Sequence, residues 1–223
     1  MTSRSWAAVV MGAALVVAAC GADDPIGDPA DAAIGIRATG CGLADRLGTG
    51  AIIADDDRAV IVTSAHTVAG AETVTAELGN GRTAVEVLVL DTERDIAVLS
   101  APAWIGPARR LGTPRADDEA SLAVWTPDEP VAVVDTTITR LLRVTIEDIY
   151  LQDEHERRAF EISADIVPGD SGAPIVAADG SVLGIVYARS RSRDGVAFAV
   201  SALELAPVVA GAGREPTDPG RCV

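Results

Sequence analysis

The sequence contains no lysine, and arginine supplies all 18 of its basic residues against 33 acidic ones. The formal charge of -15 argues against a nucleic-acid-binding protein, because such proteins neutralise phosphates with lysine and arginine. The chain also has no glycine-rich phosphate-binding loop, no paired-cysteine metal motif and no repeat at solenoid spacing. We interpret the acidity as a contribution to solubility rather than as the sign of a specific cationic partner.

A long hydrophobic run is also missing. The apolar segment from Trp6 to Ala19 is shorter than the roughly 20 residues that span a bilayer. With Arg4 before it and small residues at its end, it predicts a signal peptide over residues 1–19. Val17-Ala18-Ala19-Cys20 resembles a bacterial lipobox, with valine where leucine is usual, so Cys20 is the predicted lipid anchor to a membrane of the cell envelope. The alternative is ordinary cleavage of the signal peptide without a lipid, followed by secretion.

Cysteines are few, and their number is odd. Lipidation of Cys20 removes one of the three and leaves Cys41 and Cys222, which we expect to form a disulfide in an oxidising compartment. Two separate thiols are the alternative. Residues 20–33 are rich in Asp, Pro and Gly and predict a flexible tether, followed by a folded domain over residues 34–223.

Short apolar runs, each too short for a typical helix, fill that domain. The first half has six expected strands: Ile34–Ala38, Gly50–Ala54, Ala59–Thr63, Thr73–Leu78, Thr83–Leu90 and Ile96–Ser100. The second half has seven strand-like segments: Ser121–Trp125, Val131–Ile138, Arg143–Ile149, Phe160–Ser163, Ala173–Ala177, Val182–Ala188 and Val196–Val200. Trp104–Glu119 is interpreted as a crossover.

The expected fold is therefore all-β, with two packed six-stranded antiparallel β-barrels at about 34–103 and 120–210. Ser201 predicts the N-cap of a short C-terminal helix through about Leu205, and Pro207 should limit its extension.

The segment Val167–Pro174 reads VPGDSGAP and contains the most informative serine of the chain. Glycines two residues before and one residue after Ser171 allow a sharp turn that points the hydroxyl outward. A serine hydroxyl keeps its proton at neutral pH, so a nucleophilic serine needs a base and an orienting acid. Of the two histidines, His66 follows a predicted strand, whereas His155 lies in a charged run that we interpret as a solvated loop. Asp95 begins another strand, and Asp91 is its competitor.

The order His66, Asp95, Ser171 and the motifs GTGA at 48–51, TSAH at 63–66, DIA at 95–97 and GDSG at 169–172 resemble the trypsin-like serine peptidases. Among these, the short spacings are similar to compact bacterial HtrA-like members without a PDZ domain. The resemblance implies a serine endopeptidase in which Ser171 attacks the peptide carbonyl, His66 moves the proton and Asp95 orients His66. The backbone N–H groups of Gly169 and Ser171 would bind the oxyanion.

The resemblance also implies a protein or peptide substrate and no cofactor or metal. Ala173 departs from the family, which commonly has a second glycine there. Asp165, six residues before Ser171, could select arginine or lysine in the substrate. Proteolytic cleavage before Ile34 would free an amine with which Asp170 could pair. We expect the protein to be active without this cleavage. A catalytically silent binding module and an esterase are the alternative functions, and regulation through a PDZ-like domain is not expected.

Overall fold

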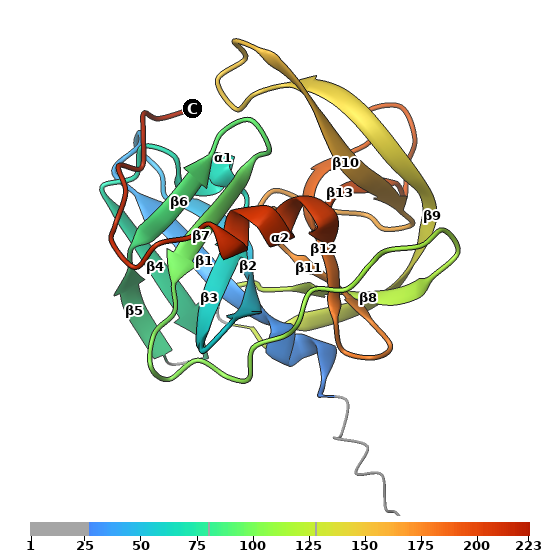
Figure 1. Cartoon of the computed structure of the whole chain (residues 1–223), viewed down its shortest axis with the longest axis horizontal. Coiled ribbons are helices and arrows are strands. Elements are labelled where there is room, and N and C mark those ends of the chain that lie inside the picture. The colour runs from blue at the N-terminus through green and yellow to red at the C-terminus, as the bar shows by residue number, and fades with distance from the viewer. Residues whose placement is uncertain (1–26, 80, 128) are drawn as a thin grey trace, which may run out of the picture.

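The structure of the protein is a computed structural model that describes residues 27–79, 81–127 and 129–223. The predicted signal peptide and Cys20 lie outside these residues. Two antiparallel β units lie side by side, and the helix α2 (Ala202–Ala210) packs across them (Figure 1). The predicted double-barrel architecture with a short C-terminal helix is confirmed.

The first unit is a seven-stranded sheet with the order β5-β4-β1-β2-β3-β7-β6. Its strands are β1 (Ala33–Thr39), β2 (Arg46–Asp55), β3 (Arg58–Thr63), β4 (Thr73–Leu78), β5 (Gly81–Val85), β6 (Val87–Asp91) and β7 (Ile96–Ser100). It has one strand more than predicted, because the apolar run 83–90 divides at Glu86. β5 pairs with β4, whereas β6 pairs with β7.

The second unit is a closed six-stranded barrel with the order β10-β13-β12-β11-β8-β9. Its strands are β8 (Glu119–Val124), β9 (Ala132–Glu147), β10 (Glu154–Ile162), β11 (Pro174–Ala177), β12 (Val182–Arg189) and β13 (Ala197–Ser201). Two predicted segments, 131–138 and 143–149, are one continuous strand, β9. The residues between them are strand-compatible, and they pair with β10.

Apolar residues form three cores, one inside each unit and one between them. The shared core joins Ile53 and Val62 of the first unit to Ile185 of the second and to Leu205 of α2. The helix continues past Pro207 to Ala210, contrary to the prediction. Buried Val208 and Val209 stabilise the last turn and offset the hydrogen bond that proline cannot make.

The N-terminal boundary also differs from the prediction. A one-turn 3-10 helix, η1 (Pro29–Ala32), precedes β1, and its N-cap Asp28 accepts a hydrogen bond from the Ala30 N–H. Ala32 and Ala33 are fully buried, so the last residues of the predicted tether belong to the folded unit. Burial of these small apolar side chains explains why the segment is ordered despite its Asp and Pro content.

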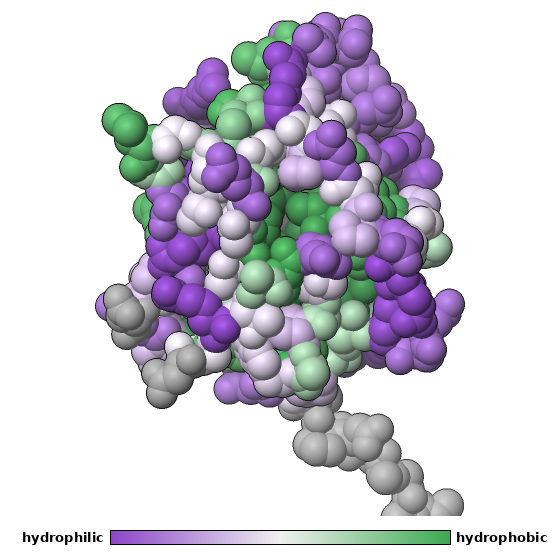
Figure 2. Space-filling view, turned by 90° about the vertical axis from the view of Figure 1, so that its left-hand side faces the viewer, coloured by the Kyte–Doolittle hydropathy of each residue, from purple (hydrophilic) through white to green (hydrophobic). Residues whose placement is uncertain are grey.

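One face of the molecule combines a hydrophilic surface with a hydrophobic hollow (Figure 2). Figure 2 views the molecule from the side of the first sheet, where hydrophilic residues cover much of the face and hydrophobic surface gathers in a central hollow. Within residues 27–79, 81–127 and 129–223, no helix is both long and apolar enough to cross a bilayer.

Candidate active site

His66 lies on α1 (Ala65–Val68), a single helical turn that directly follows β3. Arg46, at the start of β2, fixes the end of this turn. Its guanidinium donates to the carbonyl of His66 at 3.0 Å and to the carbonyl of Ala69. A cation beside the free carbonyls of a helix C-terminus is favourable. Arg46 therefore holds the backbone that carries the imidazole, a contact that the sequence motifs do not reveal.

Asp95 lies in the turn between β6 and β7 and is 7% exposed. Its backbone has a φ of 58°, a left-handed conformation that Asp adopts more readily than most residues. The carboxylate accepts a hydrogen bond from the backbone N–H of His66 at 2.9 Å, and its Oδ2 lies 2.8 Å from His66 Nδ1. Asp91, the competing acid, instead binds Arg94. Asp95 is thus the carboxylate that contacts the imidazole.

Ser171 lies in the loop between β10 and β11, where Gly169 and Gly172 have φ values of 110° and 88°. Its Oγ is 3.1 Å from His66 Nε2. A Cβ on Gly172 would come within 2.0 Å of the Thr49 carbonyl oxygen, so this position has room for no side chain. The structure therefore brings together the three side chains that the sequence singled out, with the imidazole in the middle.

Thr49 connects this loop to the first unit. Its N–H donates to the Ser171 carbonyl at 2.9 Å, and its hydroxyl lies 3.4 Å from the Gly169 carbonyl and 3.2 Å from the Trp125 N–H. Thr49 is fully buried. The sequence motif contained this residue, but only the structure reveals that its side chain joins both β units beside Ser171.

Gly169 and Ser171 line a cleft of about 410 Å³ together with Leu47, His66 and Pro168. Neither backbone N–H group of Gly169 and Ser171 is used by a hydrogen bond within the described residues. A donor pair of this kind stabilises negative charge that develops on a carbonyl oxygen.

The charge state of His66 depends on opposing influences. Burial lowers the pKa of the imidazole, but the hydrogen bond from Nδ1 to Asp95 and the negative charge of Asp95 raise it. The positive charges of Arg46 and Arg157 lower it. The net pKa of His66 is raised above its ordinary value of 6.5. An imidazole held in this way can accept a proton from Ser171 and stabilise the resulting charge through Asp95.

The remaining predicted residues lie elsewhere around the site. Asp165 accepts a hydrogen bond from the Gly195 N–H at 2.9 Å and is exposed. Asp170 accepts one from the Val167 N–H at 2.8 Å, and burial raises the pKa of its carboxyl group. Asp170 is therefore engaged within its own loop.

Cys41 and Cys222 form the predicted disulfide, which joins residues 181 positions apart. His155 lies on β10 rather than on the predicted loop, with Nδ1 3.5 Å from the Glu93 carboxylate. The alternation of β10 explains the difference, because the charged run faces solvent on one side only.

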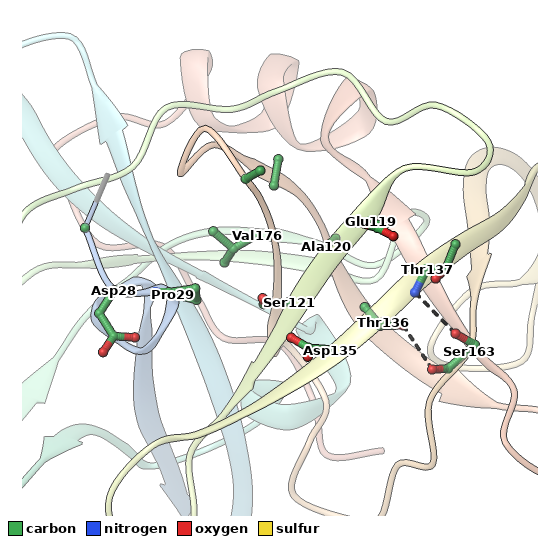
Figure 3. A pocket seen from close by; sticks show the side chains of 13 residues that line it. Asp28, Pro29, Glu119, Ala120, Ser121, Asp135, Thr136, Thr137, Ser163 and Val176 are labelled. Carbon is green, nitrogen blue, oxygen red and sulfur yellow. Dashed lines mark hydrogen bonds between the residues drawn. The ribbon is translucent and has the colours of Figure 1, made fainter. Parts of the chain in front are cut away.

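A separate hollow of about 600 Å³ lies between η1 and strands β8 and β9 (Figure 3). It contains none of the three clustered side chains. On its β9 side, Thr136 donates to the Ser163 carbonyl at 3.1 Å and the Ser163 hydroxyl accepts from the Thr137 N–H at 3.2 Å. Across residues 27–79, 81–127 and 129–223, no three His, Cys, Asp or Glu side chains gather as metal ligands would.

The chain is similar in sequence to known serine proteases. The trypsin-like peptidase domain family matches residues 48–185. Serine protease Rv3671c of Mycobacterium tuberculosis is 30% identical over 180 residues, which cover 79% of this chain and 45% of that protein. Serine protease Do-like HtrB of Bacillus subtilis is 31% identical over 167 residues, which cover 70% of this chain and 36% of that protein. The chain thus spans less than half the length of these relatives.

Solved structures agree with the sequence comparison. The active form of the Rv3671c protease superimposes with a TM-score of 0.79 and 26% identity, covering 87% of each chain. Its inactive form gives a TM-score of 0.69 with 25% identity, covering 83% of this chain and 90% of that chain.

Proposed function

Because this chain belongs to the trypsin-like peptidase family, we propose that it is a serine endopeptidase that cleaves protein or peptide substrates through His66, Asp95 and Ser171. The observation that carries the proposal is the bridging imidazole of His66, which lies 2.8 Å from Asp95 and 3.1 Å from Ser171. The closer superposition on the active than on the inactive form of the Rv3671c protease supports a competent arrangement.

Acylation is the first half of the proposed reaction. Ser171 Oγ attacks the carbonyl carbon of the substrate while His66 Nε2 takes the hydroxyl proton. The carbonyl oxygen becomes an oxyanion that accepts hydrogen bonds from the N–H groups of Gly169 and Ser171. Collapse of this intermediate breaks the C–N bond, and His66 returns the proton to the leaving amine. An ester between Ser171 and the acyl part of the substrate remains.

Deacylation repeats these roles with water as the nucleophile. His66 takes a proton from water, the hydroxide oxygen bonds to the acyl carbon, and Ser171 leaves with the proton that His66 returns. Asp95 stabilises the imidazolium in both halves. The chain therefore needs no cofactor for this reaction.

Cleavage of a peptide library tests the proposed function. We expect the wild-type protein to cleave peptides and Ser171→Ala to lose this cleavage. Ser192→Ala, which alters an exposed serine in the β12–β13 loop, is the matched control and should cleave normally. Equal cleavage by the wild type and Ser171→Ala would contradict the proposal. Turnover of simple esters without peptide cleavage would favour the esterase alternative, and absence of both activities in folded protein would favour the silent binding module.

We also propose that the protein is exported and that a lipid on Cys20 anchors it to a membrane of the bacterial envelope. The sequence of residues 1–20 supports this, and the curated relatives include a protein named as a probable periplasmic endoprotease from Halomonas elongata. Incorporation of labelled palmitate by the wild type but not by Cys20→Ala is the expected result. Equal incorporation, or release of unlabelled wild-type protein into the medium, would contradict the anchor.

A further inference from the structure

Arg157 is a buried cation next to the proposed active site. It lies on β10, and the residue is 2% exposed. Across the described residues, no carboxylate lies within ion-pair distance of its guanidinium. Burial of a charge without an ion-pair partner is unfavourable. A contribution to stability therefore does not explain why Arg157 is buried here.

The contacts of Arg157 connect it to the turn that carries Asp95. Its Nη1 donates to the carbonyl oxygen of Arg94 at 2.6 Å, and this carbonyl belongs to the peptide that enters Asp95. Its guanidinium carbon lies 4.2 Å above the ring centre of Tyr187 on β12, a cation–π geometry. Its Nε is buried and has no hydrogen-bond partner in the part of the chain that the structure describes. The side chain is thus held between Tyr187 and the Arg94 carbonyl.

The position of the Arg94 carbonyl affects the conformation of Asp95, because the two belong to adjacent residues of the same turn. Asp95 has the left-handed φ of 58°, which is unfavourable for a residue with a side chain. The side chain of Arg94 is bound to Asp91 at 2.8 Å and to Glu204 at 3.1 Å. Arg157 binds the backbone of the same residue from the second β unit. A shift of this peptide would move the Asp95 carboxylate relative to the imidazole.

We propose that Arg157 is a positioning residue for Asp95, which fixes the Arg94–Asp95 peptide and supplies a permanent positive charge beside the Asp95–His66 pair. This inference rests on the proposed function, because it assigns a role within the same site. It adds a residue from β10 to a site whose three proposed catalytic residues come from other segments. Arg157 itself touches no reacting atom.

Electrostatics at His66 supports the proposed charge effect. The titratable or charged side chains around the imidazole come from several elements. Asp45, just before β2, lines the same cleft, and Arg46 at the start of β2, Asp95 in the β6–β7 turn and Arg157 on β10 act on His66, while Tyr187 on β12 lies against Arg157. Arg157 lowers the pKa of His66 through its charge, whereas Asp95 raises it. Burial raises the pKa of Tyr187, the charge of Arg157 lowers it, and that of Asp95 raises it, so Tyr187 is neutral near pH 7.

The test measures how fast a fluorophosphonate probe labels Ser171 as a function of pH. Arg157→Met removes the charge and the hydrogen bond, whereas Arg157→Lys keeps the charge but replaces the planar guanidinium with a shorter ammonium group that reaches the Arg94 carbonyl less well. We expect Arg157→Met to lower the maximal labelling rate constant by about ten- to a hundredfold, because misplacement of a catalytic group by a fraction of an ångström slows proton transfer. Probe affinity should stay near the wild-type value. A shift of a fraction of an ångström leaves the Asp95 carboxylate next to the imidazole, so loss of the Arg157 charge should dominate. The acid limb of the profile should then move to higher pH, because removal of a nearby cation favours the imidazolium.

Arg157→Lys should lose part of the rate but keep the acid limb at the wild-type pH. Arg143→Met is the control, because Arg143 is an exposed arginine on the neighbouring strand β9 with Glu156 as its partner. It should match the wild type in both readouts. Thermal unfolding verifies that each variant is folded.

A folded Arg157→Met protein with the wild-type rate constant, or with an unmoved acid limb, would overturn the inference. If Arg157→Met does not fold, Arg157→Lys decides, and an undiminished rate constant in that variant would overturn it. Failure of the wild type itself to react would instead contradict the proposed function. The two failures are therefore distinguishable.

Discussion

At the scale of single residues, the proposed active site depends on backbone conformations that few side chains adopt. Asp95 is left-handed at φ 58°, and Gly172 has a φ of 88° beside the Thr49 carbonyl. The sequence predicted the residues at these positions from their motifs. The motif at 48–51 contained Thr49, but the sequence did not reveal the contacts of its side chain. It gave no sign of the roles of Arg46 and Arg157, because single arginines have no pattern of their own. Their roles arise from contacts between distant segments.

The raised pKa of His66 leads to a prediction about pH. Although burial lowers this pKa, Asp95 raises it more, so the folded protein holds the imidazolium above pH 6.5. The base form is the neutral imidazole, so kcat/KM should rise with pH through a midpoint above 6.5. The contribution of this group to the free energy of unfolding has the opposite dependence. It is fully present below pH 6.5 and is lost as the pH rises through the folded pKa.

Asp95→Asn tests the cause of that shift. Without the carboxylate charge, the acid limb should move to lower pH, and the rate should fall by about 10⁴, the loss known for the corresponding change in a triad enzyme. The pH profile of kcat/KM for wild type and variant provides both values. An acid limb at the same pH in both proteins would contradict the assigned role of Asp95.

At the scale of elements, β10 carries buried charges on a strand that the sequence only partly predicted. Its second half, from Phe160, was expected from its apolar residues, but the charged residues 154–158 were not recognised as strand. Residues 154–158 are typical of an exposed loop in sequence, because all five are polar or charged. Pairing with the 16-residue strand β9 decides the outcome, and that pairing depends on residues far apart in the chain.

Glu161 on β10 gives a prediction about acid stability. Arg193 binds its carboxylate, and Arg140 and Thr139 also donate to it, so its pKa falls from 4.5 to about 2. A lowered pKa means that the stabilisation is complete above pH 4.5 and is lost as the pH falls toward 2. Because Arg140 and Arg193 are half-exposed, solvent screens the interaction, and we expect Glu161→Gln to reduce the free energy of unfolding by about 1 kcal/mol at pH 7.

Urea unfolding between pH 2 and pH 7 measures this contribution. Glu156→Gln on the same strand is the matched control, because Glu156 and its partner Arg143 are both exposed. The difference between wild type and Glu161→Gln should shrink as the pH falls from 4.5 to 2, and Glu156→Gln should differ little from the wild type throughout. Equal effects of the two substitutions at pH 7 would show that burial of Glu161 adds nothing.

At the scale of the whole molecule, the C-terminal segment returns to the first β unit. After α2 it leads to Cys222, which is bonded to Cys41, and the Gly70 N–H donates to the Pro219 carbonyl at 2.7 Å. Counting cysteines predicted this pairing. The route of the segment past Gly70, directly after the helix of His66, follows only from the tertiary structure.

Removal of the disulfide should therefore destabilise the entire domain. A link between residues 181 positions apart lowers the entropy of the unfolded chain by up to ~5 kcal/mol in the loop-closure model. The double variant Cys41→Ser, Cys222→Ser should lose several kcal/mol of unfolding free energy in urea. A reducing agent should lower the stability of the wild type and leave the double variant unchanged. Equal stability of wild type and double variant would contradict this account.

The central claim is that His66 and Asp95 turn the hydroxyl of Ser171 into a nucleophile. Mass spectrometry of the folded, mature protein after reaction with a fluorophosphonate measures this most directly, because the probe forms a stable bond only with an activated serine. The account predicts one adduct on Ser171 in the wild type and none in His66→Ala. An unmodified Ser171 in folded wild-type protein, or equal modification in His66→Ala, would contradict it.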